Sequence, residues 1–226
     1  MYIDIYYIIL VLPALILSVY AQMKVSSAFS KYSRLGSMRG FTGAEVARKL
    51  LDLNGLTNVT IERVNGNLTD HYDPSKRVVR LSESVYSSTS VAAVSVAAHE
   101  TGHAVQHGTN YAPLKIRSAV FPVVSFSSQI AIPLAVIGFI FSLQSLVNLG
   151  IILFSAVVFF QVVTLPVEFN ASARALKMLD NTGILSPDEI KASRKVLTAA
   201  ALTYLAAALT AAANLLSLIL LNYRRR

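Results

Sequence analysis

Cysteine and tryptophan are both absent from this chain of 226 residues, and charged residues make up only 14% of it. The absence of cysteine excludes disulfides, iron–sulfur clusters and thiolate zinc sites, so any metal must be held by His, Asp or Glu. The charged fraction is well below the ~25% of an ordinary soluble domain. Hydrophobic residues make up 54% of the chain and are concentrated in long blocks. The composition therefore predicts an integral membrane protein.

The formal charge of +8 comes from 20 basic and 12 acidic residues. A basic balance can indicate nucleic-acid binding, but the chain has no basic stripe interleaved with aromatic residues, so we expect no nucleic-acid partner. Membrane proteins carry an excess of Lys and Arg in their cytoplasmic segments, and this bias explains the charge better. The expected surroundings of the chain are therefore a lipid bilayer.

Four apolar runs are each long enough to cross a hydrocarbon core of ~30 Å. The first fills residues 1–22; with no basic stretch before it and no small-residue cleavage site, it predicts an anchor rather than a signal peptide. Residues 118–166 hold two runs joined only by the uncharged segment Ser142–Ser145, which predicts a transmembrane hairpin. The fourth run lies in residues 196–226 and ends in a basic tail. The predicted fold class is mainly α, a polytopic membrane protein with about four transmembrane helices.

Residues 23–117, between the first and second runs, form the expected catalytic region. Thr42 and Glu45 have the spacing of a capping box, and Gly55 stands where a helix commonly ends, so a helix is predicted between them. A second helix, rich in alanine and valine, is predicted to begin near Ser88–Ser90, where a hydroxyl can cap it. This second helix is the expected zincin-like catalytic helix.

Two segments ahead of the catalytic helix, residues 59–64 and 77–81, read as β-strands. Asn65-Gly66 directly follows the first strand, and this pair is typical of a tight two-residue hairpin. We therefore expect a small β-sheet of two or three strands that covers the catalytic helix. Residues 77–81 are also a candidate sheet edge for pairing with an extended substrate.

The catalytic helix contains His99-Glu100-Thr101-Gly102-His103, an H-E-x-x-H motif. Residues four apart lie on the same face of a helix, so the two histidines can aim their imidazoles at one metal ion. Glu100 lies at the rim of that face, where it can reach a water molecule without occupying a ligand position. The alternative is that the histidines are hydrogen-bonded core residues. The motif favours a zinc site with a glutamate general base.

A catalytic zinc takes three protein ligands and keeps one position open. His107 shares the stripe of the motif, but two helical turns separate it from His99 by ~12 Å along the axis, too far for one ion. Glu168 is the strongest candidate, because a carboxylate just after Pro166 at the end of a membrane span is costly unless it is paired or binds a metal. The alternative role for Glu168 is an ion pair with Arg174.

Four further side chains are candidates for other roles near the site. Asn170 and Ser172 follow Glu168 by a few residues and can orient a ligating histidine by hydrogen bonding. His71 can donate a hydrogen bond to a transition-state oxyanion, although a histidine in such a segment is more commonly a turn residue. His107 is expected to lie outside the ligand set, either supporting a ligand or at the surface.

Three segments together resemble the YugP-type membrane-bound neutral zinc metallopeptidases of bacteria, and the similarity extends over nearly the whole chain. These segments are residues 70–86, 91–107 and 165–176. More distantly, the order of motif, transmembrane hairpin and glutamate resembles the HtpX heat-shock protease and the CAAX prenyl protease class. The resemblance implies a gluzincin site, with one Zn²⁺ ion bound by His99, His103 and Glu168, and Glu100 as the general base.

The resemblance also implies a zinc-dependent metallopeptidase acting on peptide or membrane-protein substrates, by analogy in membrane protein quality control. Zinc would activate a water molecule for attack on a peptide carbonyl, and Glu100 would accept its proton. Two alternatives are a zinc hydrolase of non-peptide substrates and a catalytically silent zinc-binding scaffold or chaperone. Glu100 disfavours the silent alternative, because a structural zinc site needs no general base.

Four spans place both termini on one side of the membrane and residues 23–117 and 167–195 on the other. The terminal side carries three basic residues near a span, Arg224–Arg226. Segment 167–195 carries five, which are Arg174, Lys177, Lys191, Arg194 and Lys195. The positive-inside rule therefore directs the catalytic region to the cytoplasm. We expect a multi-pass protein of the bacterial plasma membrane whose active site faces the cytoplasm.

Overall fold

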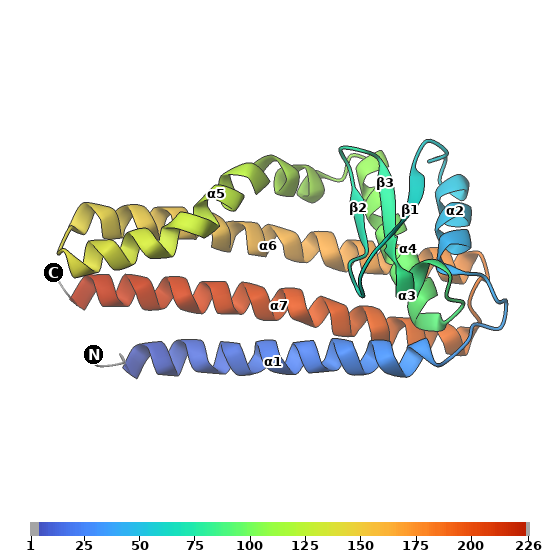
Figure 1. Ribbon diagram of the computed structural model, residues 1–226, viewed down its shortest axis with the longest axis horizontal. Coiled ribbons are helices and arrows are strands. Elements are labelled where there is room, and N and C mark those ends of the chain that lie inside the picture. Colours follow the sequence, from blue (N-terminus) through green and yellow to red (C-terminus); the bar gives the residue numbers. More distant parts are fainter. Residues whose placement is uncertain (1–4, 225–226) are drawn as a thin grey trace. The chain divides into compact units, whose positions relative to one another are not determined.

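A computed structural model of the chain describes residues 5–224, which form seven helices and three strands (Figure 1). The helices are α1 (Ile5–Ser33), α2 (Gly43–Leu53), α3 (Glu83–Tyr86), α4 (Val91–Gly108), α5 (Ala112–Ile140), α6 (Gln144–Asn181) and α7 (Pro187–Arg224). The strands are β1 (Thr60–Val64), β2 (His71–Asp73) and β3 (Val78–Ser82). Arg225 and Arg226 of the basic tail, and the first four residues of the expected anchor, lie outside the described residues.

The chain divides into two compact units, each built from segments that are distant in the sequence. Unit 1 contains the residues up to Gln22, Lys115–Pro166 and the residues from Thr203 onward. Unit 2 contains Met23–Leu114 and Val167–Leu202. The H-E-x-x-H motif and Glu168 therefore both belong to unit 2, although a transmembrane hairpin separates them in the sequence.

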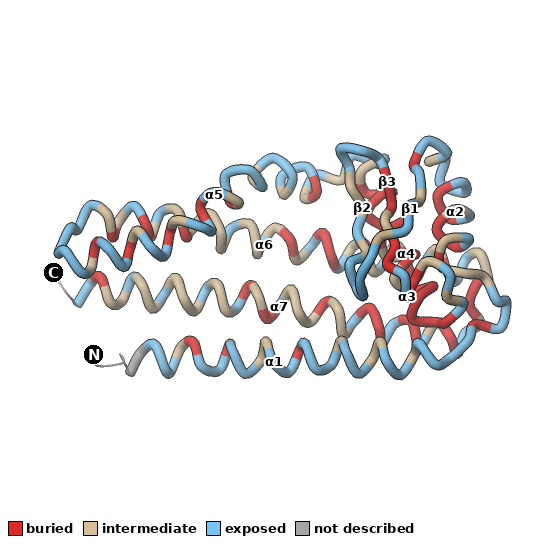
Figure 2. Tube along the Cα trace, viewed as in Figure 1, coloured by how far each residue is buried: buried red, intermediate tan, exposed pale blue. Residues whose placement is uncertain are grey.

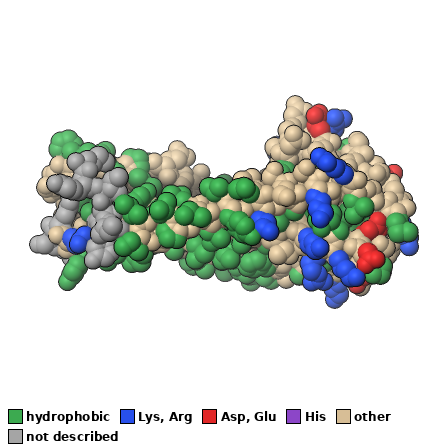
Figure 3. Space-filling model, turned by 90° about the horizontal axis from the view of Figure 1, so that it is seen from below, with side chains coloured by type: hydrophobic (Ala, Val, Ile, Leu, Met, Phe, Trp, Pro, Cys, Tyr) green, Lys and Arg blue, Asp and Glu red, His purple; other side chains and the backbone are tan. Residues whose placement is uncertain are grey.

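Unit 1 is built from helices that are long and apolar enough to cross a membrane. Four helices meet this description: α1 over Tyr7–Ser33, and α5, α6 and α7 over their whole lengths. Their outer faces are exposed (Figure 2), and hydrophobic side chains cover much of the long helices on the face drawn in Figure 3. Such exposed apolar surface fits a hydrocarbon solvent. The predicted fold class, mainly α with four spans and a small sheet, is confirmed, and the chain is a membrane protein.

Small residues and short hydrogen bonds hold the helices of unit 1 together, as expected where lipid removes the hydrophobic drive for association. A Cβ added at Gly150 of α6 would lie 2.7 Å from the backbone oxygen of Ala131 in α5, so only glycine permits this approach. The hydroxyls of Ser18 in α1 and Thr210 in α7 are hydrogen-bonded at 3.0 Å. The predicted α5–α6 hairpin is therefore a closely packed pair.

Unit 2 is organised around α4, which is buried along most of its length (Figure 2). One side of α4 packs through Val91, Val94 and Ala98 into a core shared with α2, α6 and α7. The other side packs through Ala93, Ala97 and Ala104 into a second core with α2, α3 and the sheet. Alanine and valine predominate in α4 because both sides of the helix meet close neighbours. This double burial holds the H-E-x-x-H motif rigidly.

Local signals in the sequence predict the ends of the unit 2 helices well. Thr42 caps α2, and its capping box with Glu45 is complete, because the Thr42 N–H donates to the Glu45 carboxylate at 2.8 Å. Gly55 follows α2 with a left-handed φ of 72°, which glycine adopts at no steric cost. The Ser90 hydroxyl accepts from the Ala93 N–H and caps α4. These predictions are confirmed.

The predicted tight hairpin at Asn65-Gly66 is wrong. Strands β1 and β3 pair in parallel, and β2 pairs with β3 in antiparallel register, so the sheet order is β1-β3-β2. The turn residues after β1 therefore open a longer connection to β2 instead of joining two neighbouring strands. Two parallel strands cannot be joined by a two-residue loop, because the chain must return to the edge of the sheet at which the first strand began.

The prediction that residues 77–81 form a free sheet edge is also wrong. Residues 78–81 belong to β3, the central strand, which has a neighbour on both sides, and Arg77 directly precedes it. Its apolar side chains are buried, with Val79 and Leu81 both 0% exposed. The outer strands of this sheet are β1 and β2, so any strand addition has to occur at one of them.

Gly102, inside the H-E-x-x-H motif, allows α4 to approach α6 closely within unit 2. A Cβ at this position would lie 2.7 Å from the backbone oxygen of Ala171, which cannot move without moving α6. Ala171 lies three residues after Glu168, so the same contact sets how near the predicted third ligand comes to the two histidines. The glycine of the motif thus has a packing role that is separate from catalysis.

Gly102→Ala is expected to destabilise the protein by roughly 1–3 kcal/mol, the usual cost of overpacking, although alanine favours helices by ~1 kcal/mol. Zinc occupancy is expected to fall as well, because α6 is displaced. Thermal unfolding and metal analysis of the detergent-purified protein measure both effects. Gly36→Ala is the matched control, since a Cβ at Gly36 meets nothing within 4 Å. Equal behaviour of the two variants would contradict the packing role of Gly102.

Candidate metal centre

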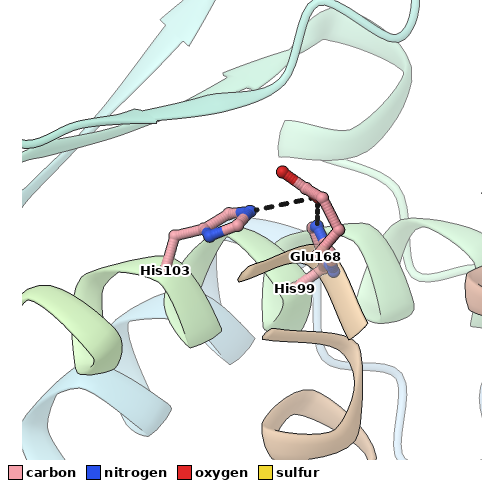
Figure 4. A group of neighbouring side chains, drawn as sticks. All are labelled: His99, His103 and Glu168. Carbon is pink, nitrogen blue, oxygen red and sulfur yellow. Dashed lines mark hydrogen bonds and ion pairs between the residues drawn. The ribbon is translucent and has the colours of Figure 1, made fainter. Parts of the chain in front are cut away.

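Three side chains from two helices meet in unit 2 (Figure 4). His99 and His103 come from consecutive turns of α4, and Glu168 comes from α6. Their possible ligand atoms all lie within 4.8 Å of one another. The Glu168 Oε2 atom is 3.3 Å from His99 Nε2 and 3.5 Å from His103 Nε2. The structure therefore brings together the three residues that were predicted as metal ligands.

The two distances from Glu168 to the imidazoles fit a tetrahedral zinc ion. Zinc binds His nitrogen and carboxylate oxygen at about 2.0–2.2 Å, and tetrahedral angles then separate neighbouring ligand atoms by about 3.3–3.5 Å. The rings of His99 and His103 are nearly perpendicular, at 85°, with centroids 4.8 Å apart. Both rings turn their Nε2 atoms toward the same carboxylate oxygen, as Figure 4 shows. Three ligands of this kind leave a fourth position for water or substrate.

The hydrogen bonds of Gln106 determine which nitrogen of His103 carries a proton. The Gln106 amide Nε2 donates to the backbone oxygen of Val167 at 2.8 Å, and that oxygen can only accept. The Gln106 Oε1 atom must therefore be the one that faces His103 Nδ1, at 3.0 Å. Because an amide oxygen only accepts, Nδ1 of His103 carries the proton. Its Nε2 then presents a lone pair to the cluster, which is the metal-binding tautomer.

A chain of hydrogen bonds extends from His103 to the surface of α6. The Gln106 amide also donates to Asn170 Oδ1 at 3.0 Å, and Arg174 Nε donates to the same oxygen at 2.8 Å. Arg174 is thus bonded to Asn170, and Glu168 faces the two histidines. Asn170 was predicted to orient a ligating histidine; it has no direct bond to His103 here but is hydrogen-bonded to Gln106, which contacts that ring.

Ser172 contacts the other histidine directly. Its hydroxyl lies 3.2 Å from His99 Nδ1, on the side of the ring opposite Glu168. The hydroxyl oxygen can accept a hydrogen bond from Nδ1–H, the tautomer that leaves the Nε2 lone pair available for a metal. Each histidine therefore has a polar partner on Nδ1, as metal-ligating histidines almost always have.

The electrostatics of the cluster favour a bound cation. Burial alone would lower the pKa of His103, but its hydrogen bond to Glu168 and the negative charge of Glu100 and Glu168 outweigh burial and raise it. The carboxylates thus stabilise a positive charge at this point. Nδ1 of His103 already carries a proton, so a hydrogen bond from Nε2 to Glu168 would require an imidazolium. A metal ion between the three side chains supplies the positive charge without that second proton.

Glu100 is buried beside the cluster but does not belong to it. Its residue is 8% exposed, and among the described residues no side chain or backbone group forms a hydrogen bond to its carboxylate. Burial raises the pKa of the Glu100 carboxyl, and the charges of His99 and His103 lower it to a smaller extent. A carboxylate with a raised pKa and no internal partner is suited to accept a proton from water.

The two other histidines lie outside the cluster. His107 forms a hydrogen bond through Nδ1 to the Tyr72 hydroxyl at 2.8 Å, one helical turn beyond His103. His71 is exposed on β2, with Nδ1 2.8 Å from the backbone oxygen of Thr69. The expectation that His107 is not a ligand agrees with this geometry. His71 is held by its own strand connection, so we assign it no catalytic role.

Sequence reasoning missed Gln106. It reads as an ordinary continuation of α4, yet it is 0% exposed and connects His103 to α6 by three hydrogen bonds. The available signal was its spacing: a polar residue three positions after a motif histidine, in a helix otherwise rich in alanine and valine. Residues three apart share a helix face, so the amide can reach the His103 ring.

Gln106→Ala is expected to weaken zinc binding by roughly 10- to 100-fold, the usual cost of losing a partner of a ligating histidine. The variant leaves Nδ1 of His103 and the Val167 carbonyl without their partner. Competition with a chelating dye measures the zinc dissociation constant. Ser172→Ala removes only the 3.2 Å contact with His99 and is expected to have the smaller effect. Unchanged affinity in the Gln106 variant would contradict this role.

Comparison with known proteins agrees with this arrangement. The family model described as "Putative neutral zinc metallopeptidase" matches residues 7–223. The chain belongs to this family. It is also 52% identical over 215 residues to the "Putative membrane protease YugP" of Bacillus subtilis (strain 168), covering 95% of this chain and 96% of that protein. No solved structure matches the chain. The predicted resemblance is confirmed, and the family implies zinc as the metal.

Proposed function

We propose that this family member is a zinc metalloendopeptidase with one Zn²⁺ ion bound by His99, His103 and Glu168. The observation that carries the proposal is the pair of imidazole Nε2 atoms aimed at one buried carboxylate oxygen, 3.3 and 3.5 Å away. An H-E-x-x-H helix with a glutamate from a later helix is a gluzincin arrangement. The intact Glu100 beside the cluster supports an enzyme rather than a structural zinc site.

Each part of the site has a separate role in the proposed reaction. Zinc bound here supplies a Lewis acid that lowers the pKa of water and polarises a carbonyl oxygen. Glu100 accepts the proton of the attacking water and then delivers it to the leaving amine nitrogen of the cleaved peptide bond. Gln106 and Ser172 hold the two imidazoles in orientation. Burial of the cluster limits competing water and strengthens each of these electrostatic interactions.

The substrate is a polypeptide in this proposal, and membrane proteins in quality control are the candidate substrates. Four apolar helices place the enzyme in a bilayer, where such substrates occur. An extended substrate can pair with β2, an outer strand whose neighbour on one side is β3. This assignment replaces the predicted edge at residues 77–81, which is internal to the sheet.

Metal removal tests the proposed function. The detergent-purified protein is expected to contain about one zinc ion per chain and to cleave casein. A chelator should abolish both the bound zinc and the cleavage, and added Zn²⁺ should restore them together. Bound zinc without cleavage of casein or any other peptide would favour the scaffold or chaperone. Zinc-dependent hydrolysis of esters or amides but not peptides would favour a non-peptide hydrolase.

We also propose that the site faces the cytoplasm of a bacterial plasma membrane. The support is the distribution of basic residues, since five lie between residues 167 and 195 on the side of the predicted site. Orientation can be tested with a cysteine placed at Ser142 or Ser145, because the chain has no native cysteine. A membrane-impermeant reagent is expected to label this cysteine in intact cells. Labelling only after lysis would show the opposite orientation.

A further inference from the structure

A cavity in unit 2 is lined by none of the three predicted ligand side chains. It has a volume of about 320 Å³ and is bounded by α4, β2, the connection before β1, the turn between β2 and β3, and the connection after α4. The residues that matter for its chemistry are Asn58, Tyr72, Arg77, Ala104, His107 and Asn110. Its volume lies at the lower end of the range for binding pockets and is ample for one side chain.

The cavity begins one residue beyond a predicted zinc ligand. Ala104 directly follows His103. His107 lies one helical turn beyond His103, about 6 Å along the axis of α4. Tyr72 reaches the cavity from β2, an outer strand of the sheet. The cavity therefore lies within about one helical turn of a predicted zinc ligand along α4.

Hydrogen-bonding groups and a cation line this cavity. The Tyr72 hydroxyl is bonded to Nδ1 of His107 at 2.8 Å, so these two side chains hold each other in place. Asn58 and Asn110 add side-chain amides to the lining. Arg77 adds a guanidinium, whose charge lowers the pKa of Tyr72 although burial raises it overall. The lining is thus rich in hydrogen-bond donors. Among its residues, Arg77 is the one with a permanent charge, and that charge is positive.

The Arg77 side chain has no hydrogen bond or ion pair among the described residues, whereas its backbone oxygen accepts from the Thr60 N–H at 3.1 Å. The acidic side chain closest in sequence, Asp73, is already engaged by Ser75 at 2.6 Å and by Arg80 at 3.1 Å. Arg77 is exposed, and its guanidinium is therefore not neutralised by any side chain that the structure describes. Arg77 also has a φ of 53°, and Asn110 on the same cavity has a φ of 55°. Left-handed backbone is uncommon for residues other than glycine, and such residues concentrate at functional sites.

We propose that this cavity binds a carboxylate of the substrate, with Arg77 as the main partner. Arginine binds carboxylates through two parallel hydrogen bonds, and the amides of Asn58 and Asn110 can add further donors. The carboxylate has two possible sources: the side chain of an aspartate or glutamate next to the cleaved bond, or the C-terminus of the substrate. The proposal rests on the proposed peptidase function and gives that site a preference for acidic substrates.

Zinc-loaded Glu100→Gln protein provides a test in which binding can be measured without cleavage. Fluorescently labelled peptides are compared in pairs that differ by Glu or Gln at one position, and in pairs with a free or amidated C-terminus. Fluorescence polarisation is expected to show roughly 10-fold tighter binding of the carboxylate member of one pair, as for a hydrogen-bonded charge. A preference within the Glu/Gln pairs identifies a side chain, and one within the C-terminal pairs identifies the terminus.

Arg77→Asn in the same background is expected to bring the ratio of the two peptides' dissociation constants close to 1. Arg77→Lys is expected to keep part of the preference. Asparagine tolerates the left-handed backbone of this position, so the variant should fold. Lys76→Asn removes the neighbouring cation and is expected to keep the full preference. Equal binding of both members of every pair, or a preference that survives Arg77→Asn, would overturn the proposal.

The same design separates this proposal from the proposed function. Wild-type protein that binds the acidic peptides in an Arg77-dependent way but cleaves none of them would support the cavity and contradict the peptidase. Cleavage of peptides with no dependence on acidic residues or on Arg77 would support the peptidase and contradict the carboxylate-binding cavity.

Discussion

Glu100→Gln is expected to reduce peptide hydrolysis by roughly 10²- to 10⁴-fold, the range for loss of a general acid–base residue. Glutamine has nearly the same shape as glutamate but cannot accept the proton of the attacking water. Zinc content should stay near that of the wild type, because Glu100 is outside the group formed by His99, His103 and Glu168. Initial rates of casein cleavage and metal analysis of the same preparation measure the two quantities.

Glu83→Gln is the matched control for this substitution. Glu83 is a glutamate of α3 in an exposed ion pair with Arg63, and such pairs contribute little to stability. Its replacement is expected to leave both zinc and activity near the wild-type values. Loss of zinc in the Glu100 variant would show that Glu100 is a ligand, and full activity would show that another group is the base.

Glu168→Ala is expected to have the largest effect on metal binding. It removes one of three protein ligands, so zinc affinity should fall by more than the roughly 10- to 100-fold caused by loss of an outer partner. Two histidines of one helix remain, and they can no longer enclose the ion with α6. Activity should be lost together with zinc, in contrast to Glu100→Gln, which separates the two. Zinc titration against a chelating dye measures the change.

Asp180→Ala is the matched control on the same helix. Asp180 is an exposed acid near the end of α6, twelve positions after Glu168. Removal of its carboxylate should not change zinc binding. Wild-type zinc content in Glu168→Ala would show that the third ligand has been assigned to the wrong residue, whatever the activity of the variant.

The order of the strands illustrates what local sequence signals omit. Asn65-Gly66 correctly marks a change of direction after β1, but the choice of neighbour for β1 depends on the whole sheet. Residues 77–81 read as a strand, and the structure places the last four of them in β3, the central strand. Alternation and turn residues act over a few positions, whereas strand pairing joins segments that are far apart in the sequence. The cavity at Arg77 follows from that pairing and had no sequence signal.

The sequence by itself determined the four apolar helices, the caps of α2 and α4, and the placing of His99, Glu100 and His103 on one helix. These features depend on hydrophobic length, helical period and the chemistry of adjacent residues. Glu168 could be singled out because a carboxylate at the end of a span is energetically costly. Only the tertiary structure decided how close Glu168 comes to the histidines, since Gly102 sets the approach of α4 to Ala171. It also decided that Gln106 orients His103, because a hydrogen bond across two helices depends on which faces meet.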